Sequence, residues 1–401
     1  MRRLETGMTA EATDQRPYPS VSQDDMFWRI EDPGEFLSDI LHQTVWGALR
    51  LPGRSLRRLR SIWVPGCGRR QALDLALRFP AATVTGTDVN KTALNLCMAD
   101  AQSLGVTNLD LSCEDMCGHS GEYDYIVCTG VLHHLTSPHA GMQAIRKCLG
   151  EYGLAEVMIL GHYRNGRTAA MKQALEHVCS SGSRCDDRTK RRLAEKMAWA
   201  PTCLDEHLTI LTEQHAHTFS LDQFLEIATM GEWTVQQPVP SRIDGGWELR
   251  SPVDLSPASP GDNEFVQRVR AMCDFDRWVV AEMLLYDAAP PTWFYLTYRP
   301  SGRLTMVERA RRFAQANWRP LQATATAYVR GLDGRLTARP PIAFPGTHPE
   351  TPVREALARW DVRRSAAENL KDVLVRGEHD LSWLRDRLTS PAFPYLVEVG
   401  D

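Results

Sequence analysis

Residues 61–70 read SIWVPGCGRR, and this stretch decides the fold that we expect for the chain. Its first five residues, Ser61–Pro65, form a short apolar run of the kind that makes a buried strand. The turn Gly66-Cys67-Gly68 then leads into apolar residues at helical spacing over Gln71–Arg78. A glycine turn between a strand and a helix lets backbone NH groups and the helix N-terminus approach a ligand closely. Alone, Gly66-x-Gly68 fits either a dinucleotide site or a tight turn.

Beyond this turn, strands and helices alternate along the chain. Such alternation predicts a parallel sheet whose crossover helices cover both of its faces. We therefore expect an α/β fold with a doubly wound, mostly parallel sheet. The expected strands are 83–87, 109–113, 123–128 and 154–160, and the expected helices are 91–104 and 139–149.

Candidate ligand-binding residues follow the ends of three further strands, and in open α/β sheets ligands bind at the carboxyl ends of the strands. Asp88 follows the second strand, where a carboxylate can accept both ribose hydroxyls of a nucleoside; the alternative is the N-cap of the next helix. Asp115 follows the third strand, where it can hold an adenine edge; the alternative is an N-cap or a surface turn. The full set is Asp88, Val89, Asp115, Met116, Thr129 and Gly130.

Four motifs occur in order: WVPGCGRRQ, GTDVN, CEDM and YDYIVCTGVLHHL. The set resembles the class I S-adenosylmethionine-dependent methyltransferases, above all a bacterial branch whose first motif is close to VAGCGTGxQA and whose fourth is GVLHHL. The resemblance covers about residues 61–165 and implies backbone contacts from Gly66, Cys67 and Gly68 to the cofactor. The chain departs from the family in two places. Val64 stands where many members carry an acid, and Arg70 stands where the turn usually ends in a third glycine.

The resemblance implies a Rossmann-like, seven-stranded sheet with helical insertions, to which we add a small C-terminal α+β domain. We expect a disordered tail and a helical lid over 1–60, because apolar residues between 25 and 59 recur at helical spacing. The methyltransferase domain would span 61–300, with a helical insertion at about 166–290, and an accessory domain would span 301–401. Ser220 is expected to cap a helix that Gly231 ends, and Asp333-Gly334 to turn a hairpin.

The candidate catalytic residues are His133, Tyr163 and Arg164. His133, like its neighbour His134, suits a general base or a substrate contact, the alternative being a hydrogen bond that stabilises the loop. Tyr163 can line an acceptor pocket and Arg164 can clamp a carboxylate, the alternative being surface packing. Further candidates for the pocket walls are Trp28, Trp233, Trp247 and Tyr295, which are core residues in the alternative interpretation; Glu282 is a candidate because it belongs to a helix expected to cap the site.

Composition excludes several classes of protein. The chain has 401 residues, with 46 Lys and Arg against 50 Asp and Glu and a net charge of −4. This balance argues against a nucleic-acid-binding protein, and the basic runs at 54–60 and 188–192 are interpreted as solvated helix faces. No apolar run is long enough to cross a membrane and the N-terminus lacks a signal peptide, so we expect a cytoplasmic protein. The cysteine pairs Cys113/Cys117 and Cys179/Cys185 lack the CxxC form, so we expect reduced thiols and no metal.

The expected activity is transfer of a methyl group from S-adenosylmethionine, by in-line displacement, to an O or N atom of a small polar metabolite or natural-product intermediate, with S-adenosylhomocysteine as the product. Large additions around the site suit an enclosed pocket, which favours a small-molecule acceptor over duplex nucleic acid, and no membrane partner is expected. A protein or peptide acceptor recognised by residues 301–401 is the alternative, and a non-catalytic protein that binds S-adenosylmethionine is a third hypothesis. The oligomeric state, a homodimer included, stays open.

Overall fold

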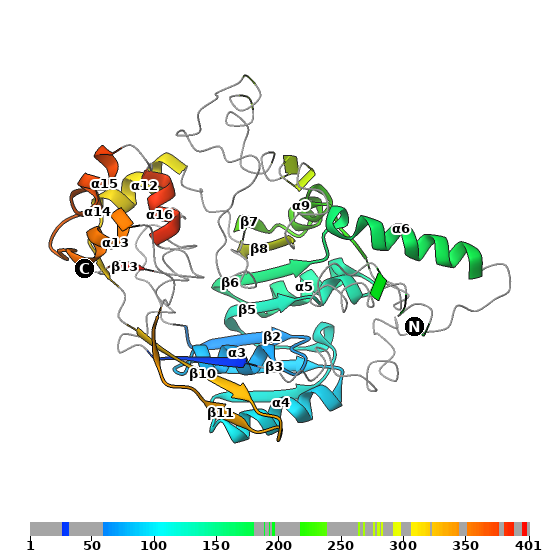
Figure 1. Cartoon of the computed structure of the whole chain (residues 1–401). Helices are drawn as coiled ribbons and strands as arrows, with labels where there is room; N and C mark the ends of the chain where they lie inside the picture. Colours follow the sequence, from blue (N-terminus) through cyan, green and yellow to red (C-terminus); the bar gives the residue numbers. More distant parts are fainter. Residues whose placement is uncertain are drawn as a thin grey trace.

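The computed structural model describes residues 26–31, 59–179, 217–238, 292–297, 306–320, 323–344, 351–376, 381–388 and 395–398, with single helical residues between 188 and 283. A seven-stranded sheet forms its centre, in the order β4-β3-β2-β5-β6-β8-β7 (Figure 1). The first five strands in this order are parallel, whereas β8 runs antiparallel to both of its neighbours. The strands are β2 (Ser61–Pro65), β3 (Thr83–Asp88), β4 (Leu109–Cys113), β5 (Tyr123–Thr129), β6 (Leu149–Ile159), β7 (Thr234–Pro238) and β8 (Thr292–Thr297). The predicted Rossmann-like, mostly parallel sheet of seven strands is thus confirmed.

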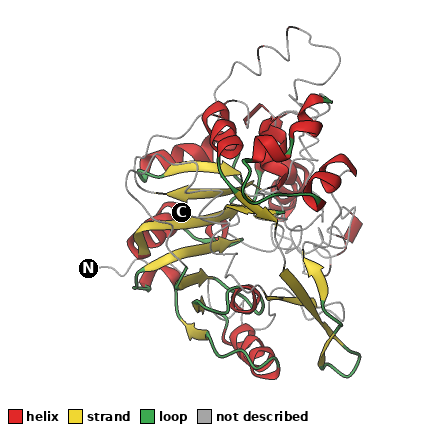
Figure 2. Cartoon of the chain, turned by 90° about the vertical axis from the view of Figure 1, so that its left-hand side faces the viewer, coloured by secondary structure: helices red, strands yellow, loops and turns green. Residues whose placement is uncertain are grey.

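Helices cover both faces of this sheet (Figure 2). They are α3 (Gln71–Arg78), α4 (Lys91–Ser103), α5 (Pro138–Cys148), α6 (His162–Cys179) and α9 (Leu221–Met230), with short 3-10 turns η2 (Met116–Gly118) and η3 (Leu132–His134). Ser220 caps α9 through a capping box and Gly231 ends the helix, as predicted. Two boundaries here differ from the expected ones: the helix expected over 139–149 ends at Cys148, and β6 begins at Leu149 where the strand was expected from 154.

Strand residues alternate between two hydrophobic layers. Ile62 and Val64 of β2 face the layer that contains α3, whereas Trp63 between them faces the layer that contains α5 and α9. The same alternation runs through β5, where Tyr125 joins the first layer and Ile126 the second. Because a strand alternates its side chains, two apolar layers require the near-continuous apolar runs seen in the sequence.

A strand near the N-terminus forms a sheet with strands from the C-terminal part of the chain. β1 (Met26–Glu31) pairs antiparallel with β10 (Ala323–Arg330), which also pairs with β11 (Leu336–Ala338) and β12 (Ile342–Phe344). We call these four strands the terminal sheet; it lies beside α3 and α4 (Figure 1). The helical prediction is therefore wrong for residues 26–31, and the remainder of the expected lid lies outside the described residues. The predicted hairpin is confirmed, with Gly334 at φ +79° in the turn between β10 and β11.

A buried ion cluster joins the terminal sheet to the central fold. Asp100 of α4 binds Arg69, at 3.0 Å, and Arg330 of β10, at 2.8 Å. Next to it, Phe27 of β1 is buried against α3 and α4. The terminal sheet is thus attached through both apolar packing and charge.

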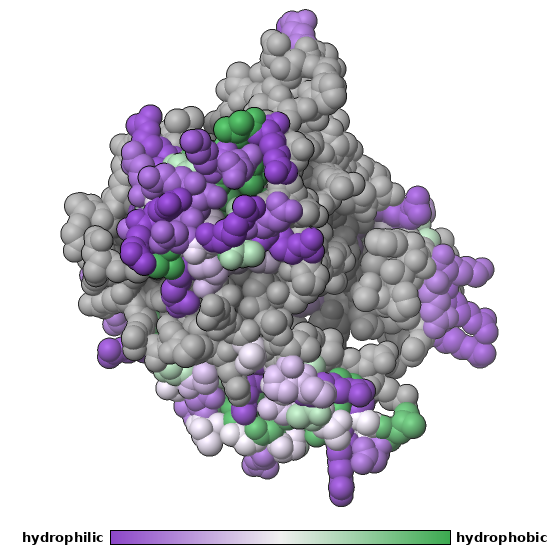
Figure 3. Space-filling model, turned by 60° about the vertical axis from the view of Figure 1, so that its left-hand side comes forward, coloured by the Kyte–Doolittle hydropathy of each residue, from purple (hydrophilic) through white to green (hydrophobic). Residues whose placement is uncertain are grey.

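The remaining C-terminal elements surround their own core, which supports an α+β arrangement there. They are α12 (Met306–Gln315), β9 (Trp318–Pro320), α13 (Thr351–Ala358), α14 (Ala366–Asn369), α15 (Lys371–Val375), α16 (Leu381–Leu388) and β13 (Leu396–Glu398). Phe313, Trp318 and Leu384 lie in this core, and β13 pairs antiparallel with β9. The outer surface over these helices is mainly hydrophilic (Figure 3). Among the described helices, none is long and apolar enough to span a membrane.

Candidate functional site

The glycine turn after β2 has the conformation that the sequence predicts. Gly66 and Gly68 have φ angles of +59° and +55°, a region that favours glycine. A Cβ atom added at Gly66 would also lie 2.4 Å from Cγ2 of Val131, so a side chain is excluded there on two grounds. Cys67 N donates to Thr87 O at 3.0 Å, which joins the turn to the end of β3.

Asp88 ties this turn to the next strand end. Its Oδ2 accepts from Gly68 N and its Oδ1 accepts from Asn90 N, both at 2.8 Å. The N-cap of α4 is Asn90, whose Oδ1 accepts from Ala93 N, so the N-cap alternative for Asp88 is wrong. Because a carboxylate offers about four lone-pair sites, the half-buried Asp88 retains acceptor capacity for a ligand.

The ends of β3 and β4 lie side by side. Asp88 is in register with Cys113, and Glu114 N donates to Asp88 O at 3.1 Å. Asp115 caps η2 by accepting from Cys117 N, which confirms the N-cap alternative for this residue and leaves its adenine contact untested. Met116 is buried in the core against α5, so its side chain is not open to a ligand. Val89 is half-buried beside this edge.

An aromatic network that the sequence analysis missed supports the loop after β4. His119 stacks on Trp63 with ring centroids 4.5 Å apart, and its Nδ1 and Nε2 lie 3.0 Å from Glu114 Oε1 and 2.9 Å from Tyr123 Oη. Hydrogen bonds from Ser112 and then from His119 lower the pKa of Glu114. The network holds the segment that carries Asp115.

The end of β5 brings together buried polar groups. Thr129 Oγ1 and His133 Nδ1 are both buried, and neither has a hydrogen-bond partner in the described part of the chain. Gly130 adopts φ +74° and lies beside the His133 ring. His133 is only 3% exposed, and burial, followed by the charges of His134 and His217, holds its pKa well below the usual value. His133 is therefore neutral near pH 7.

A short segment, residues 217–219, is hydrogen-bonded to this edge of the sheet. His217 N donates to His133 O at 2.9 Å, and Phe219 N donates to Leu160 O at the same distance. Asn165, in the first turn of α6, is 1% exposed and donates from Nδ2 to Gly161 O at 3.0 Å. Sequence reasoning missed Asn165 and His217, because neither belongs to a motif and each reaches the site only through the fold.

Neither departure from the family motif enters the site. Val64 is fully buried in the core layer next to α3. The Arg70 guanidinium pairs with Asp74 at 3.2 Å and lies 5.0 Å from the centroid of the Phe27 ring. Arg70 therefore points along α3 toward β1 and away from the ligand side of the turn.

The remaining candidate residues from the sequence lie in different surroundings. Tyr163 is half-buried and lies edge-on to His162, whereas the side chains of Arg164 and Trp28 lie outside the described residues, as does all of Trp247. Trp233 and Tyr295 are core residues, as in the alternative interpretation. Glu282 accepts from Leu221 N at 2.7 Å at the start of α9. Arg188 and Arg192 are exposed, and residues 54–58 lie outside the described chain.

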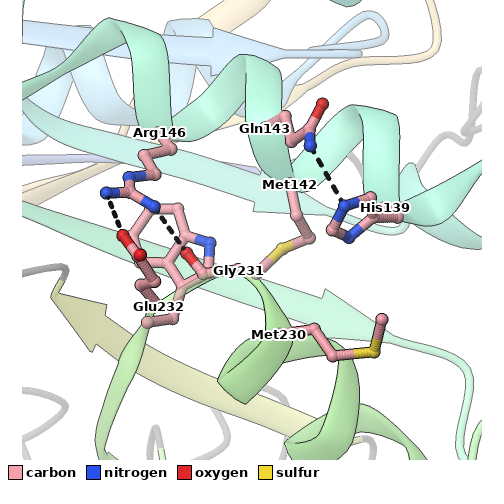
Figure 4. A pocket seen from close by; sticks show the side chains of 8 residues that line it. His139, Met142, Gln143, Arg146, Met230, Gly231 and Glu232 are labelled. Carbon is pink, nitrogen blue, oxygen red and sulfur yellow. Dashed lines mark hydrogen bonds and ion pairs between the residues drawn. The ribbon is translucent and has the colours of Figure 1, made fainter.

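A separate hollow of about 170 Å³ lies between α5 and the turn after α9 (Figure 4). Arg146 crosses it, donating to Gly231 O at 2.9 Å and pairing with Glu232 at 2.6 Å. Because β7 runs parallel to β6 and starts just after this turn, the hollow lies toward the amino edge of the sheet. It is therefore distinct from the edge that carries Asp88. Its lining residues are His139, Met142, Gln143, Arg146, Met230, Gly231, Glu232 and Trp233.

The carboxyl edge fits the cofactor that the resemblance implies. The positive φ angles of the turn and the exclusion of a Cβ at Gly66 leave bare backbone at the start of α3. Asp88 offers a carboxylate to a ribose, and η2 begins at the adjacent strand end. No group of three His, Cys, Asp or Glu side chains suited to a metal occurs among the residues that the structure describes.

Comparisons with known proteins agree with this geometry. Residues 66–155 match the family model described as a methyltransferase domain. A curated relative, the uncharacterized protein syc1184_c of Synechococcus sp., is 30% identical over 115 residues, which make up 27% of this chain and only 28% of that relative.

Among solved structures, PKMT2 from Rickettsia typhi in complex with AdoHcy aligns with 88% of this chain and 72% of its own, at a TM-score of 0.51 and 14% identity. PKMT2 in a second structure aligns with 92% of this chain and 77% of its own, at a TM-score of 0.51 and 16% identity. These likenesses show the fold. The described chain thus has a Rossmann-like methyltransferase fold, and its residues 66–155 are similar to a methyltransferase domain.

Proposed function

We propose that this chain is an S-adenosylmethionine-dependent methyltransferase that acts on an O or N atom of a small polar metabolite or natural-product intermediate. The observation that carries the proposal is the position of Asp88, whose carboxylate binds Gly68 N of the glycine turn and still has acceptor capacity at the end of β3. The match of residues 66–155 to a methyltransferase domain supports it. Gly66, Cys67 and Gly68 would contact the cofactor through their backbone, with Asp115, Met116, Thr129 and Gly130 along the same edge.

When bound, S-adenosylmethionine supplies an electrophilic methyl group on a good leaving group. The work left to the chain is to bind and orient, because near-attack geometry accounts for much of the acceleration in such a displacement. A general base is needed only where the acceptor atom is protonated. Of the two roles considered for His133, the lowered pKa favours a substrate contact over a base, since a buried imidazole resists protonation. Tyr163 and Arg164 remain proposed acceptor contacts.

Two alternatives make different predictions. A protein or peptide acceptor would use residues 301–401 as a recognition domain next to a methyltransferase domain at 61–300, and the likeness to PKMT2, which extends over most of the chain, is compatible with such an arrangement. The second alternative is a non-catalytic binding protein, and the features that favour it are Val64 and Arg70, the two departures from the family motif. Both side chains are engaged away from the site, which weakens this alternative.

The proposal is tested by calorimetric titration with S-adenosylmethionine of the wild-type chain, of Asp88→Ala and of Asp110→Ala. Asp110 is the matched control, because it is an exposed carboxylate on the neighbouring strand β4. Loss of two charge-assisted hydrogen bonds to a ribose, each worth about 1.5 kcal/mol or more, should weaken binding about 150-fold in Asp88→Ala. Asp110→Ala should stay within about twofold of wild type.

A folded wild type that binds neither S-adenosylmethionine nor S-adenosylhomocysteine would contradict the proposed function. Unchanged affinity in a folded Asp88→Ala variant would contradict only the placement of the ribose. Release of S-adenosylhomocysteine in the presence of small polar acceptors, but not of peptides, would separate the main proposal from the peptide alternative.

A further inference from the structure

We propose that Asn165 and His133 form a subsite for the acceptor molecule that binds an uncharged hydrogen-bond donor, such as a hydroxyl or an amide NH, beside the end of β5. This inference rests on the proposed function and deepens it, because it names the chemical character of the acceptor. Neither the sequence motifs nor the match of residues 66–155 assigns a role to Asn165.

A chain of backbone hydrogen bonds connects the loop that carries His133 with the helix turn that carries Asn165, beside the ends of the neighbouring strands β5 and β6. His133 O accepts from His217 N, and two residues later Phe219 bridges to Gly161. Gly161 O in turn accepts from both the backbone N and the side-chain Nδ2 of Asn165, at 3.1 and 3.0 Å. The segment 217–219 therefore connects the loop after β5 to the first turn of α6, and the two side chains belong to opposite ends of this connection.

Each of the two side chains has a buried atom that lacks a hydrogen-bond partner within the described residues: Asn165 Oδ1 and His133 Nδ1. Thr129 Oγ1, at the end of β5, is buried and unpartnered in the same way. Leaving a buried polar group unsatisfied costs about 1–3 kcal/mol. Most native structures avoid this cost, so several such atoms at one sheet edge indicate a position that a ligand fills.

The chemistry of these atoms selects the ligand. Because Asn165 uses its amide NH₂ group on Gly161 O, its Oδ1 is left as an acceptor and requires a donor from the ligand. A neutral imidazole presents one donor and one acceptor nitrogen, and His133 is held neutral by burial and by the nearby His134 and His217. None of these atoms carries a charge near pH 7. A hydroxyl or amide satisfies the set, whereas a carboxylate would meet an acceptor oxygen and lose its hydration without a counter-ion.

The test uses three fluorinated probes of similar size, fluorobenzyl alcohol, protonated fluorobenzylamine and fluorobenzoate, each titrated by fluorine NMR into the full chain loaded with S-adenosylhomocysteine. The alcohol should bind more tightly than the other two. Asn165→Leu should weaken alcohol binding about tenfold, which corresponds to the loss of about 1.4 kcal/mol for one hydrogen bond. Asn165→Asp keeps the shape of the side chain and adds a charge, so it should strengthen binding of the amine about tenfold or more.

The matched control is Asn95→Asp, an exposed position on α4, which should leave all three affinities within about twofold. Calorimetry with S-adenosylhomocysteine is run on every variant, because failure of cofactor binding in the wild type would refute the proposed function itself. If the cofactor binds but the alcohol does not, the subsite is refuted. Preferential binding of fluorobenzoate, or equal effects of Asn165→Asp and Asn95→Asp on the amine, would also overturn it.

Discussion

Replacing Asp100 with alanine should destabilise the folded chain by about 3 kcal/mol or more. Asp100 is shared by two guanidinium groups, from Arg69 at 3.0 Å and from Arg330 at 2.8 Å. The exposed fractions of the side chains are 11% for Asp100, 4% for Arg69 and 10% for Arg330, so water screens the cluster little. Removing one partner of a buried ion pair costs about 3–5 kcal/mol, because the other charge stays buried without compensation.

A graded series of variants separates this effect from a simple loss of packing. Arg330→Met leaves the pair of Arg69 and Asp100 intact and should cost about 1.5–3 kcal/mol, the value of a hydrogen bond to a charged group. The triple variant Asp100→Leu, Arg69→Met and Arg330→Met removes every charge and should return to within about 1 kcal/mol of wild type. The exposed control Asp110→Ala should change stability by less than about 0.5 kcal/mol.

The assay is equilibrium unfolding in urea, followed by tryptophan fluorescence and by far-UV circular dichroism. Coincidence of the two transitions checks that a single free energy of unfolding describes the variants. The reasoning is refuted if Asp100→Ala lowers the free energy of unfolding by less than about 1 kcal/mol, since removing a buried carboxylate that two guanidinium groups share should cost more than that. It is also refuted if the triple variant is as unstable as Asp100→Ala, since packing rather than charge would then be the cause.

Three further predictions follow from single positions. Gly66→Ala should abolish measurable binding of S-adenosylmethionine in calorimetry, because φ is +59° and the new Cβ would lie 2.4 Å from Val131; retained affinity would show that the turn is more adaptable than its geometry. Lowering the pH below about 6.5 should reduce the free energy of unfolding by up to about 1.4 kcal/mol per pH unit through His133, since the unfolded state then binds a proton that the buried ring does not. His133→Phe should flatten that slope in urea titrations, and an unchanged slope would contradict the assignment. Arg70→Gly should leave the Kd for S-adenosylmethionine within about twofold while costing about 1 kcal/mol of stability, as the contacts to Asp74 and Phe27 are lost; a marked gain in affinity would show that Arg70 obstructs the site.

Much of the central fold could be predicted from the sequence because its determinants are local. The strands β2 and β4 and the helix α3 have the expected bounds, since apolar periodicity and glycine turns act within a few residues. The wrong helical prediction for residues 26–31 also came from local apolar spacing. Phe27 and Ile30 have the spacing of one helix face, yet residues 26–31 form the strand β1. Pairing with β10, almost three hundred residues away, overrides the local pattern.

The residues of the candidate site also fall into two groups, those that a sequence motif predicts and those that only the fold brings to the site. The motifs predicted Gly66, Gly68 and Asp88 because a strand end, its turn and the next strand end lie close together in any parallel sheet. Asn165 and His217 carry no pattern of their own. Asn165 lies at the site because α6 starts directly after β6, and His217 lies there because its backbone N donates to His133 O.

The parallel sheet and the conformation of the glycine turn follow from local sequence, because the hydrophobic period and the steric freedom of glycine are properties of neighbouring residues. Which surfaces these elements bury depends on the packing of the whole fold. It turned Arg70 toward Phe27, placed Arg330 on Asp100 and left the Asn165 carbonyl unpartnered among the described residues. Such contacts depend on segments distant in sequence that meet when the remaining apolar surface of α3 and α4 is covered, and no local pattern encodes that meeting.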